Sequence, residues 1–364
     1  MRTRSESPRT DSLDRARAIL RPHLPELTRR RAWIYWTDLL GTSLLAWSAL
    51  ATGAAISGGA FDLPGGARLL LGVMLFGLAT LMLYRASAFL HEVAHVRGSM
   101  PEFTAAWDAL VGVPLLMPSL IYDRVHMTHH DRSVFGTDAD PEYVPGEGGH
   151  GHHGARLAAF ALLPVHLLLR WGIVTPLSLV HRGVRQFAVA RLSSLASNPV
   201  YRRPSPEGPE ARRWWTLELA CSGWCLALAA AAITGVLPLG ALAFALGVAS
   251  VVSILHGVRS FAAHRFEGGG ASRTLDEQFL DSVNVTGHPL FTELWAPLGL
   301  RYHALHHLAP RLPYHALGRA HRLLLASLPA NDPYRRVTFD SLSEVIAHVS
   351  AAPPEPRPVA CEAA

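Results

Sequence analysis

Histidine is the residue type in this sequence whose number and spacing point to chemistry. The chain has 20 histidines, and eight of them lie in three short clusters that read HEVAH, HMTHH and HALHH. On a helix, residues three and four positions apart share one face, so each cluster would direct its imidazole rings to a common point. Two copies of the H-x-x-H-H pattern exceed what chance would place in such a chain. The clusters predict metal ligands at His91, His95, His126, His129, His130, His303, His306 and His307.

A ninth ligand is predicted from its depth relative to a membrane. One apolar segment near residues 68–89 ends just before the first cluster, and another near 238–258 ends just before His264. About 20 helical residues cross a bilayer core of roughly 30 Å, so both sites would emerge at the same height. Nine imidazoles without a ligating thiolate suit two metal ions. Redox chemistry on a lipid would favour iron over zinc.

Composition and charge-free runs predict an all-α, multi-pass membrane protein. Hydrophobic residues make up 49% of the chain and charged residues 17%, against about 25% charged residues in soluble domains. Two apolar hairpins predict about four transmembrane helices, near residues 37–58, 68–89, 215–235 and 238–258. A cytoplasmic helical cap would carry the histidine clusters. The three cysteines are too few for a disulfide framework.

The distribution of arginine predicts the orientation. The short connections at residues 58–68 and 235–240 hold only Asp62 and Arg68 as charged residues, whereas the other connections are rich in arginine. By the positive-inside rule, both termini and the metal site would be cytoplasmic. Residues 1–31 read as a basic arm that favours a membrane surface over nucleic acid, residues 32–350 as the membrane domain, and residues 351–364 as a disordered tail.

Two further apolar stretches, at residues 105–122 and 155–180, are interrupted by proline and by charged side chains. These interruptions favour interfacial or re-entrant helices over complete crossings. An odd number of additional crossings would place the later histidines on the wrong face of the membrane. The parity of the crossings is therefore a constraint on the topology.

From about Trp33 to Arg336, the sequence resembles the membrane-bound fatty acid desaturases. The resemblance rests on the order of the three clusters, on their positions after the second and fourth crossings, and on the flanks FGTDADPEY (135–143) and GLRYHALHHLAPRLPYHAL (299–317). It implies a non-haem di-iron centre held by the eight clustered histidines, with His264 matching an additional family histidine. The centre would use dioxygen to remove hydrogens from an unactivated fatty acyl chain carried on a lipid, CoA or a carrier protein.

The chain itself shows no haem, flavin or iron–sulfur motif, so a ferredoxin or a small cytochrome would have to donate the electrons. Desaturation is the predicted outcome. The three-residue spacing in HEVAH also occurs in hydroxylases and ketolases of related branches, so hydroxylation or ketone formation on a lipid at the same di-iron site is the alternative.

Other interpretations remain for several residues. HEVAH also fits the H-E-x-x-H motif of a zinc metalloprotease, with Glu92 as general base and Asp281 or Asp340 as a further ligand. In the di-iron interpretation, Glu92 would accept a ring N–H or a proton beside the ligands. His288 could replace His264 as ninth ligand, and Asn284 could hold a metal-bound water. The segment GGHGHHG, with His150, His152 and His153, could suit a metal transporter or sensor, although its glycines favour a solvated loop.

Overall fold

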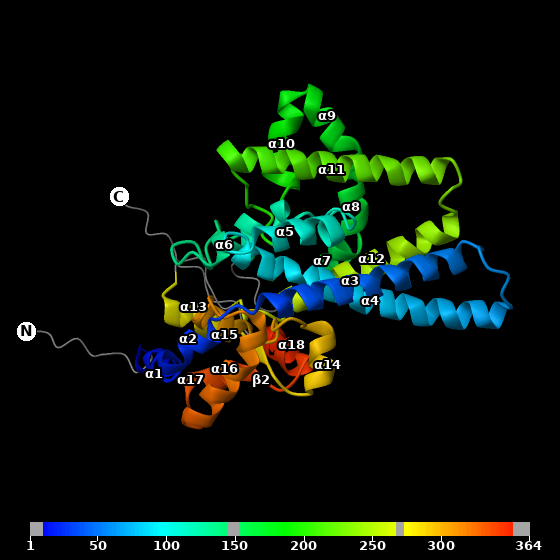
Figure 1. The fold of residues 1–364 in the computed structure, drawn as a ribbon. Coiled ribbons are helices and arrows are strands. Elements are labelled where there is room, and N and C mark those ends of the chain that lie inside the picture. Colours follow the sequence, from blue (N-terminus) through cyan, green and yellow to red (C-terminus); the bar gives the residue numbers. More distant parts are fainter. Residues whose placement is uncertain (1–9, 144–152, 267–272, 352–364) are drawn as a thin grey trace, which may run out of the picture.

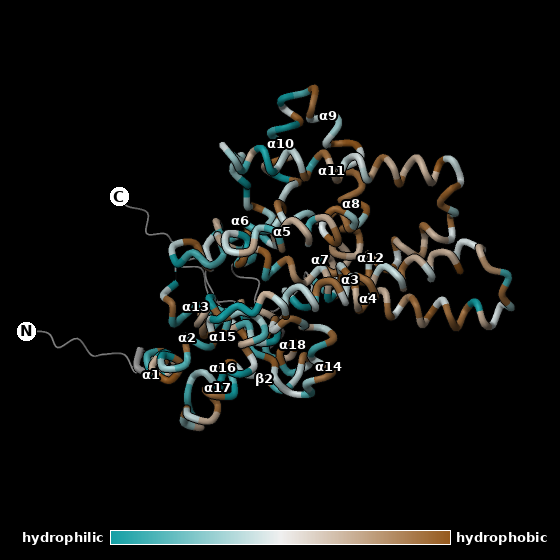
Figure 2. The backbone as a smooth tube through the Cα atoms, viewed as in Figure 1, coloured by the Kyte–Doolittle hydropathy of each residue, from teal (hydrophilic) through white to brown (hydrophobic). Residues whose placement is uncertain are grey.

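The computed structural model describes residues 10–143, 153–266 and 273–351, and it is built almost entirely from helices (Figure 1). Its longest helices form two hairpins, α3 (Ala32–Ser57) with α4 (Gly65–Val96) and α11 (Gly208–Ile233) with α12 (Leu239–Phe261). These helices cover the four predicted crossings, and α4 extends far enough to include the first histidine cluster. Hydrophobic residues predominate along the long helices of the two hairpins, whereas hydrophilic residues are concentrated at the opposite end of the molecule (Figure 2).

Glycine permits the turn and the packing of each hairpin. The residues that follow α3 and α11 include Gly59, with φ of +83°, and Gly235, with φ of +77°, values that favour glycine. The two turns lie against each other, because a Cβ added at Gly240 would lie 2.1 Å from the carbonyl oxygen of Ser57. The glycine at 240 therefore lets the start of α12 pack against the end of α3.

A fifth helix, Leu163–Val180, also has the length and composition of a membrane span. It consists of α8 (Leu163–Leu169), the π-helix η4 (Arg170–Val174) and α9 (Thr175–Val180). Length and hydropathy thus admit five spans, and the predicted number of about four is not confirmed. Figure 1 shows α8 running across the direction of α11. Arg170 of η4 is buried and pairs with the equally buried Glu218 of α11.

The remaining helices precede, connect or follow the two hairpins. In chain order they are α1 (Thr10–Leu20), η1 (Arg21–His23), α2 (Leu24–Leu27), α5 (Pro101–Trp107), η2 (Asp108–Gly112), η3 (Ser119–Ile121), α6 (Asp123–His129), α7 (His153–Ala161), α10 (Arg182–Leu192), α13 (Leu275–Asp281), α14 (Pro289–Trp295), α15 (His303–Leu308), α16 (Tyr314–Ser327), α17 (Pro333–Arg336) and α18 (Leu342–Ala351). The part of the fold from α13 to α18 is called the cap. Across the described ranges the only sheet is a parallel pair, β1 (Asn284–Val285) with β2 (Thr338–Phe339), in which Asn284 lies opposite Thr338.

The N-terminal helices pack onto the cap. The buried side chains of α1 share one hydrophobic cluster with those of α16, namely Leu13, Ala16, Leu20, Leu317 and Leu324. Arg319 of α16 also forms an ion pair with Glu26 of α2. Residues 10–27 of the predicted basic arm are therefore packed on the cap. Of the predicted tail, only residue 351 lies within the described residues.

Candidate metal centre

The structure brings all nine predicted histidines together in two adjacent groups. The first histidine group comprises His91, His95, His126, His130 and His306. The second histidine group comprises His129, His264, His303 and His307. In the second group, one ring nitrogen from each histidine lies within 4.8 Å of the others. The same distance holds for four members of the first group, His91, His95, His126 and His306. His130 joins the first group because its Nε2 lies 3.0 Å from Nε2 of His126 and of His306.

Four parts of the fold supply these rings. The end of α4 carries the first cluster, α6 and the residue after it carry the second, and α15 carries the third. His264 follows α12, where it forms an isolated antiparallel bridge with Ser282. Each helical cluster contributes rings from one face, as its spacing predicts. The second cluster contributes to both groups because His129 and His130 are neighbours on α6 and its C-cap.

The Nε2 atoms face one another at short range. His126 Nε2 lies 3.0 Å from His95 Nε2, and in the second group His264 Nε2 lies 3.1 Å from His129 Nε2 and 3.0 Å from His303 Nε2. One proton at most can bridge such a pair of nitrogens. Rings that each face two others therefore bring several lone pairs to the same point.

Carboxylates lie on the opposite side of three rings, and two of them are within hydrogen-bond distance of Nδ1. His129 Nδ1 lies 2.9 Å from Asp140 Oδ1, and His126 Nδ1 lies 2.9 Å from Glu142 Oε1. His264 Nδ1 lies 3.6 Å from Asp281 Oδ2. A carboxylate accepts the Nδ1 proton and leaves Nε2 as a lone pair, which is the tautomer that ligates metal. Sequence reasoning did not assign this role to any of the three acids, although Asp140 and Glu142 lie in the FGTDADPEY flank.

The arrangement of the donors fits two cations. The convergent Nε2 lone pairs would repel one another without a positive charge between them. Both ring nitrogens of His91 are buried without a hydrogen-bond partner among the described residues, as expected of a ligand whose partner is an ion. The chemistry of the donor set, nine imidazoles and no thiolate, is that of borderline metal ions.

For six of the seven ligand rings outside α4 the pKa is lowered, which agrees with neutral ligands, and His129 is the exception. Burial lowers the pKa well below the usual value for five of these rings, those of His126, His130, His303, His306 and His307. Burial also lowers the pKa of His264. For His129, burial is outweighed by the charge and hydrogen bond of Asp140, and its pKa is raised. A carboxylate thus strengthens the basicity of this ligand.

His303 has a different partner. Its Nδ1 lies 3.2 Å from Nη2 of Arg259, which can only donate. A guanidinium at this position withdraws electron density from the ring, whereas the carboxylate at His129 supplies it. The second group therefore combines ligands of unequal basicity.

Hydrogen bonds of the Asn284 side chain fix the position of α15. The side chain of Asn284 in β1 accepts from the backbone N–H of Leu305 (3.1 Å) and donates to Thr338 Oγ1 (3.3 Å). Pairing of β1 with β2 fixes Asn284 in turn. Asn284 therefore holds the helix of the third cluster and does not direct its amide to the histidines.

A family model described as fatty acid desaturase matches residues 64–339. The chain belongs to the fatty acid desaturase family. It is also 39% identical to a ceramide hydroxylase of Caulobacter vibrioides over 326 residues, which cover 88% of this chain and 89% of that protein. No solved structure matches the chain. The predicted resemblance to this family is thus confirmed, and the matched region contains all nine histidines of the two groups.

Other predicted residues lie outside the two groups. His288 is exposed at the start of α14 and Asp340 is exposed after β2. Glu92 is buried and accepts a hydrogen bond of 2.6 Å from the hydroxyl of Tyr35. His150 and His152 lie outside the described residues, and the side chain of His153 is not described either.

The geometry disfavours the zinc-protease interpretation. His91 and His95 are joined by three more histidines, His126, His130 and His306, and neither predicted acidic ligand is in that group. Asp281 instead contacts His264. A zinc protease site would need one such ligand and an open position.

Proposed function

We propose that this family member is a membrane oxidoreductase that hydroxylates an acyl chain of a ceramide-like lipid with dioxygen. The observation that carries the proposal is the two-group histidine site in a chain that is similar along 88% of its length to a ceramide hydroxylase. Hydroxylation therefore takes precedence over the desaturation predicted from the sequence. Desaturation is the second candidate, because the matching family model is described by that activity.

Two iron ions are the proposed metals. His91, His95, His126, His130 and His306 would hold one, and His129, His264, His303 and His307 the other. When bound, the iron pair supplies the redox chemistry that activates dioxygen. The protein's own contribution is to keep the rings neutral, to orient His126 and His129 through Glu142 and Asp140, and to exclude water by burial.

The stoichiometry requires an external reductant. Hydroxylation converts R–H, O₂, two electrons and two protons into R–OH and one water. Desaturation consumes the same O₂, electrons and protons, takes two hydrogens from adjacent carbons and releases two waters. Dioxygen takes up four electrons in both reactions, and the substrate supplies only two of them. A separate carrier, such as a ferredoxin or a small cytochrome, would supply the other two.

We place the approach of this carrier at a narrow opening beside α4. Glu92 and His95 line its inner part, and Arg30 and Arg311 line it nearer the surface. Both arginines are exposed, and neither has a carboxylate within ion-pair distance among the described residues. A positive surface close to a metal ligand suits an acidic electron carrier, because complementary charge speeds association.

We propose that the chain is an integral membrane protein whose histidine site and both termini lie in the cytoplasm. Several apolar helices support membrane insertion. The arginine distribution along the sequence supports the orientation.

The test is expression in a host that makes ceramide, followed by mass spectrometry of its lipids and metal analysis of the purified protein. Hydroxylation predicts a ceramide 16 mass units heavier (one oxygen atom added) and about two irons per chain, one for each histidine group. A product two mass units lighter (two hydrogens lost) would establish desaturation instead. One zinc per chain with unchanged lipids would contradict both.

Variants of single histidines separate the metal role from folding. His306→Ala and His129→Ala each remove a ring from a different group, and each should lose product and bound iron while the protein remains in the membrane. His288→Asn is the matched control, because His288 is exposed, lies outside both groups and has φ of +46°, which asparagine tolerates. Retention of iron and product by either alanine variant would contradict the proposed site.

A further inference from the structure

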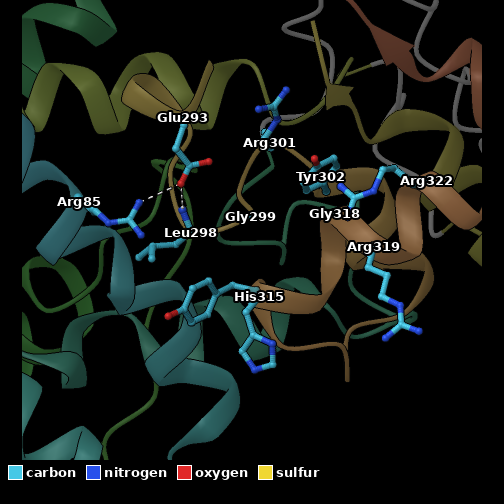
Figure 3. A pocket seen from close by; sticks show the side chains of 11 residues that line it. Arg85, Glu293, Leu298, Gly299, Arg301, Tyr302, His315, Gly318, Arg319 and Arg322 are labelled. Atoms are coloured by element: carbon cyan, nitrogen blue, oxygen red, sulfur yellow. Dashed lines mark hydrogen bonds and ion pairs between the residues drawn. The ribbon is translucent and has the colours of Figure 1, made fainter. Parts of the chain in front are cut away.

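A polar cavity of about 300 Å³ lies between α4, α14 and α16 (Figure 3). It is separate from the two histidine groups, although Tyr302, one of its lining residues, directly precedes His303. Its charged lining comprises Arg85, Glu293, Arg301, Arg319 and Arg322. Four guanidinium groups against one carboxylate give the cavity an excess of positive charge.

Two of these arginines are already paired with carboxylates. Arg85 binds Asp38 (Nη2 to Oδ2, 2.6 Å) and Glu293 (Nη1 to Oε1, 2.9 Å). Arg319 binds Glu26, and Figure 3 shows its guanidinium directed away from Tyr302 and Arg322. The positive charge available to a ligand therefore comes from the other two arginines.

Arg301 is buried, but no carboxylate neutralises it. Its guanidinium donates to the carbonyl oxygens of Val285 (3.1 Å), Thr286 (2.5 Å) and Pro289 (3.0 Å). Carbonyl oxygens satisfy its hydrogen bonds and leave its full charge in place. This charge contributes to the electrostatic potential of the cavity.

The guanidinium of Arg322 and the hydroxyl of Tyr302 are two donors that line the cavity. Within the described part of the chain, neither has a hydrogen bond or an ion pair. They lie beside each other over Gly318, where an added Cβ would be 3.3 Å from the Tyr302 hydroxyl and 3.5 Å from Arg322 Nη1. A guanidinium and a hydroxyl at one point form the donor set that an anionic oxygen requires.

The cavity lies at the level where α4 leaves the membrane. Arg85 follows the start of α4 by a helix length of about 30 Å, which is the thickness of the bilayer core. α14 is attached at the same level, because the hydroxyl of Tyr84 donates to the carbonyl oxygen of Trp295 (2.5 Å) and Arg85 binds Glu293. The cavity is thus beside the membrane–water interface.

The outward face of α14 is apolar. Leu290 is 88% exposed, Phe291 64% and Leu294 47%. An apolar helix face at the interface, next to a positive cavity, matches the two parts of a lipid. Acyl chains would contact α14, and the headgroup would enter the cavity.

We propose that this cavity binds the phosphate group of an anionic membrane phospholipid, with Arg322 and the Tyr302 hydroxyl as donors and the lipid chains along α14. The bound headgroup would tie α16 to the residue that precedes the third histidine cluster. The proposal does not depend on iron, on turnover or on the proposed reaction.

The test measures binding of phosphatidylglycerol to the purified, detergent-solubilised full chain by native mass spectrometry. Dioleoylglycerol, which has matched chains and no phosphate, is the comparison lipid. The wild type should bind phosphatidylglycerol more tightly than dioleoylglycerol. Combining Arg322→Gln with Tyr302→Phe should weaken phosphatidylglycerol binding about tenfold or more, because a charge-assisted hydrogen bond and a neutral one are lost.

Arg319→Gln is the matched control, because it removes the same charge from the same helix but from a side chain that binds Glu26. Its binding of phosphatidylglycerol should stay within about twofold of the wild type. Equal losses in both variants, or equal wild-type binding of both lipids, would overturn the proposal. Displacement of the lipid by millimolar inorganic phosphate would show that the ligand is free phosphate and would overturn the lipid assignment. Melting temperatures of all variants confirm that they are folded.

Discussion

The acids that are hydrogen-bonded to His126 and His129 decide which nitrogen of these two rings is free for a metal. Asp140 shows this most clearly, because its two oxygens contact His129 Nδ1 at 2.9 and 3.0 Å and also accept the backbone N–H of Gly136 and Glu142. The FGTDADPEY flank therefore folds around its own acid and fixes it against the ring. The function of Asp140 follows from this contact and not from the histidine spacing.

Asp140→Asn should weaken iron binding by about 10- to 100-fold, because the amide cannot accept the Nδ1 proton with the strength of a carboxylate. Metal titration of the iron-free protein measures this affinity. Asp138→Asn is the matched control, since Asp138 is exposed and only two residues away. Equal affinities in the two variants would remove the positioning role of Asp140.

Among the elements, α8, η4 and α9 are held to α11 by buried ion pairs. Glu218 of α11 binds Arg170 of η4 (2.5 Å) and Arg185 of α10, and Arg170 and Glu218 are fully buried. Arg170 also donates to Ser193 Oγ (2.9 Å). This network joins the ambiguous helix to a predicted crossing through polar contacts that hydropathy does not reveal.

Glu218→Leu should destabilise the protein by about 3–5 kcal/mol, because Arg170 would remain buried without its partner. Thermal unfolding in detergent measures the change. Adding Arg170→Met to the same variant should recover most of the loss, since no uncompensated charge remains. A single variant that unfolds at the wild-type temperature would show that the ion pair does not hold α8 and α9 in place.

On the scale of the whole molecule, the meeting of histidines from distant segments limits the number of membrane crossings between those segments. His91 and His95 at the end of α4 lie in the same two-group site as His264 after α12, so an even number of crossings must separate them. α11 and α12 supply two. A complete crossing by Leu163–Val180 would make the number odd, so we infer that this helix does not span the bilayer.

Single cysteines in a background without native cysteines test the parity. Asp138→Cys and Ser205→Cys flank the ambiguous helix and should be labelled by an impermeant thiol reagent from the same side of the membrane. Asp62→Cys and Val236→Cys lie at the hairpin turns and should be labelled from the other side. Labelling of positions 138 and 205 from opposite sides would show that Leu163–Val180 crosses.

Electron delivery provides a second test on the scale of the whole molecule. Reversing the charge at the opening with Arg30→Glu and Arg311→Glu should lower ferredoxin-driven turnover about tenfold at low ionic strength, with a smaller effect in high salt. Turnover driven by dithionite should be unchanged, because that reductant needs no docking surface. Arg182→Glu with Arg191→Glu, two exposed arginines of α10, is the matched control. Equal losses in both double variants would contradict the proposed approach.

The sequence by itself determined the features that depend on local spacing. Charge-free runs located the two hairpins, and the intervals within HEVAH, HMTHH and HALHH placed the rings of each cluster on one helix face. Depth along the chain selected His264, which the structure places beside His129 and His303. All these features follow from the rise and period of a helix, which neighbouring residues express directly.

Only the tertiary structure decided how the nine rings divide into two groups, since that division depends on distances between residues as remote as His91 and His306. It also identified Asp140, Glu142 and Asp281 as partners of the rings, left His288 outside, engaged Asn284 in holding α15, and packed residues 10–27 on the cap. Contacts of this kind form only when elements distant in sequence pack together. No local periodicity encodes them, because the pairing of two side chains across the fold depends on the positions of every element between them.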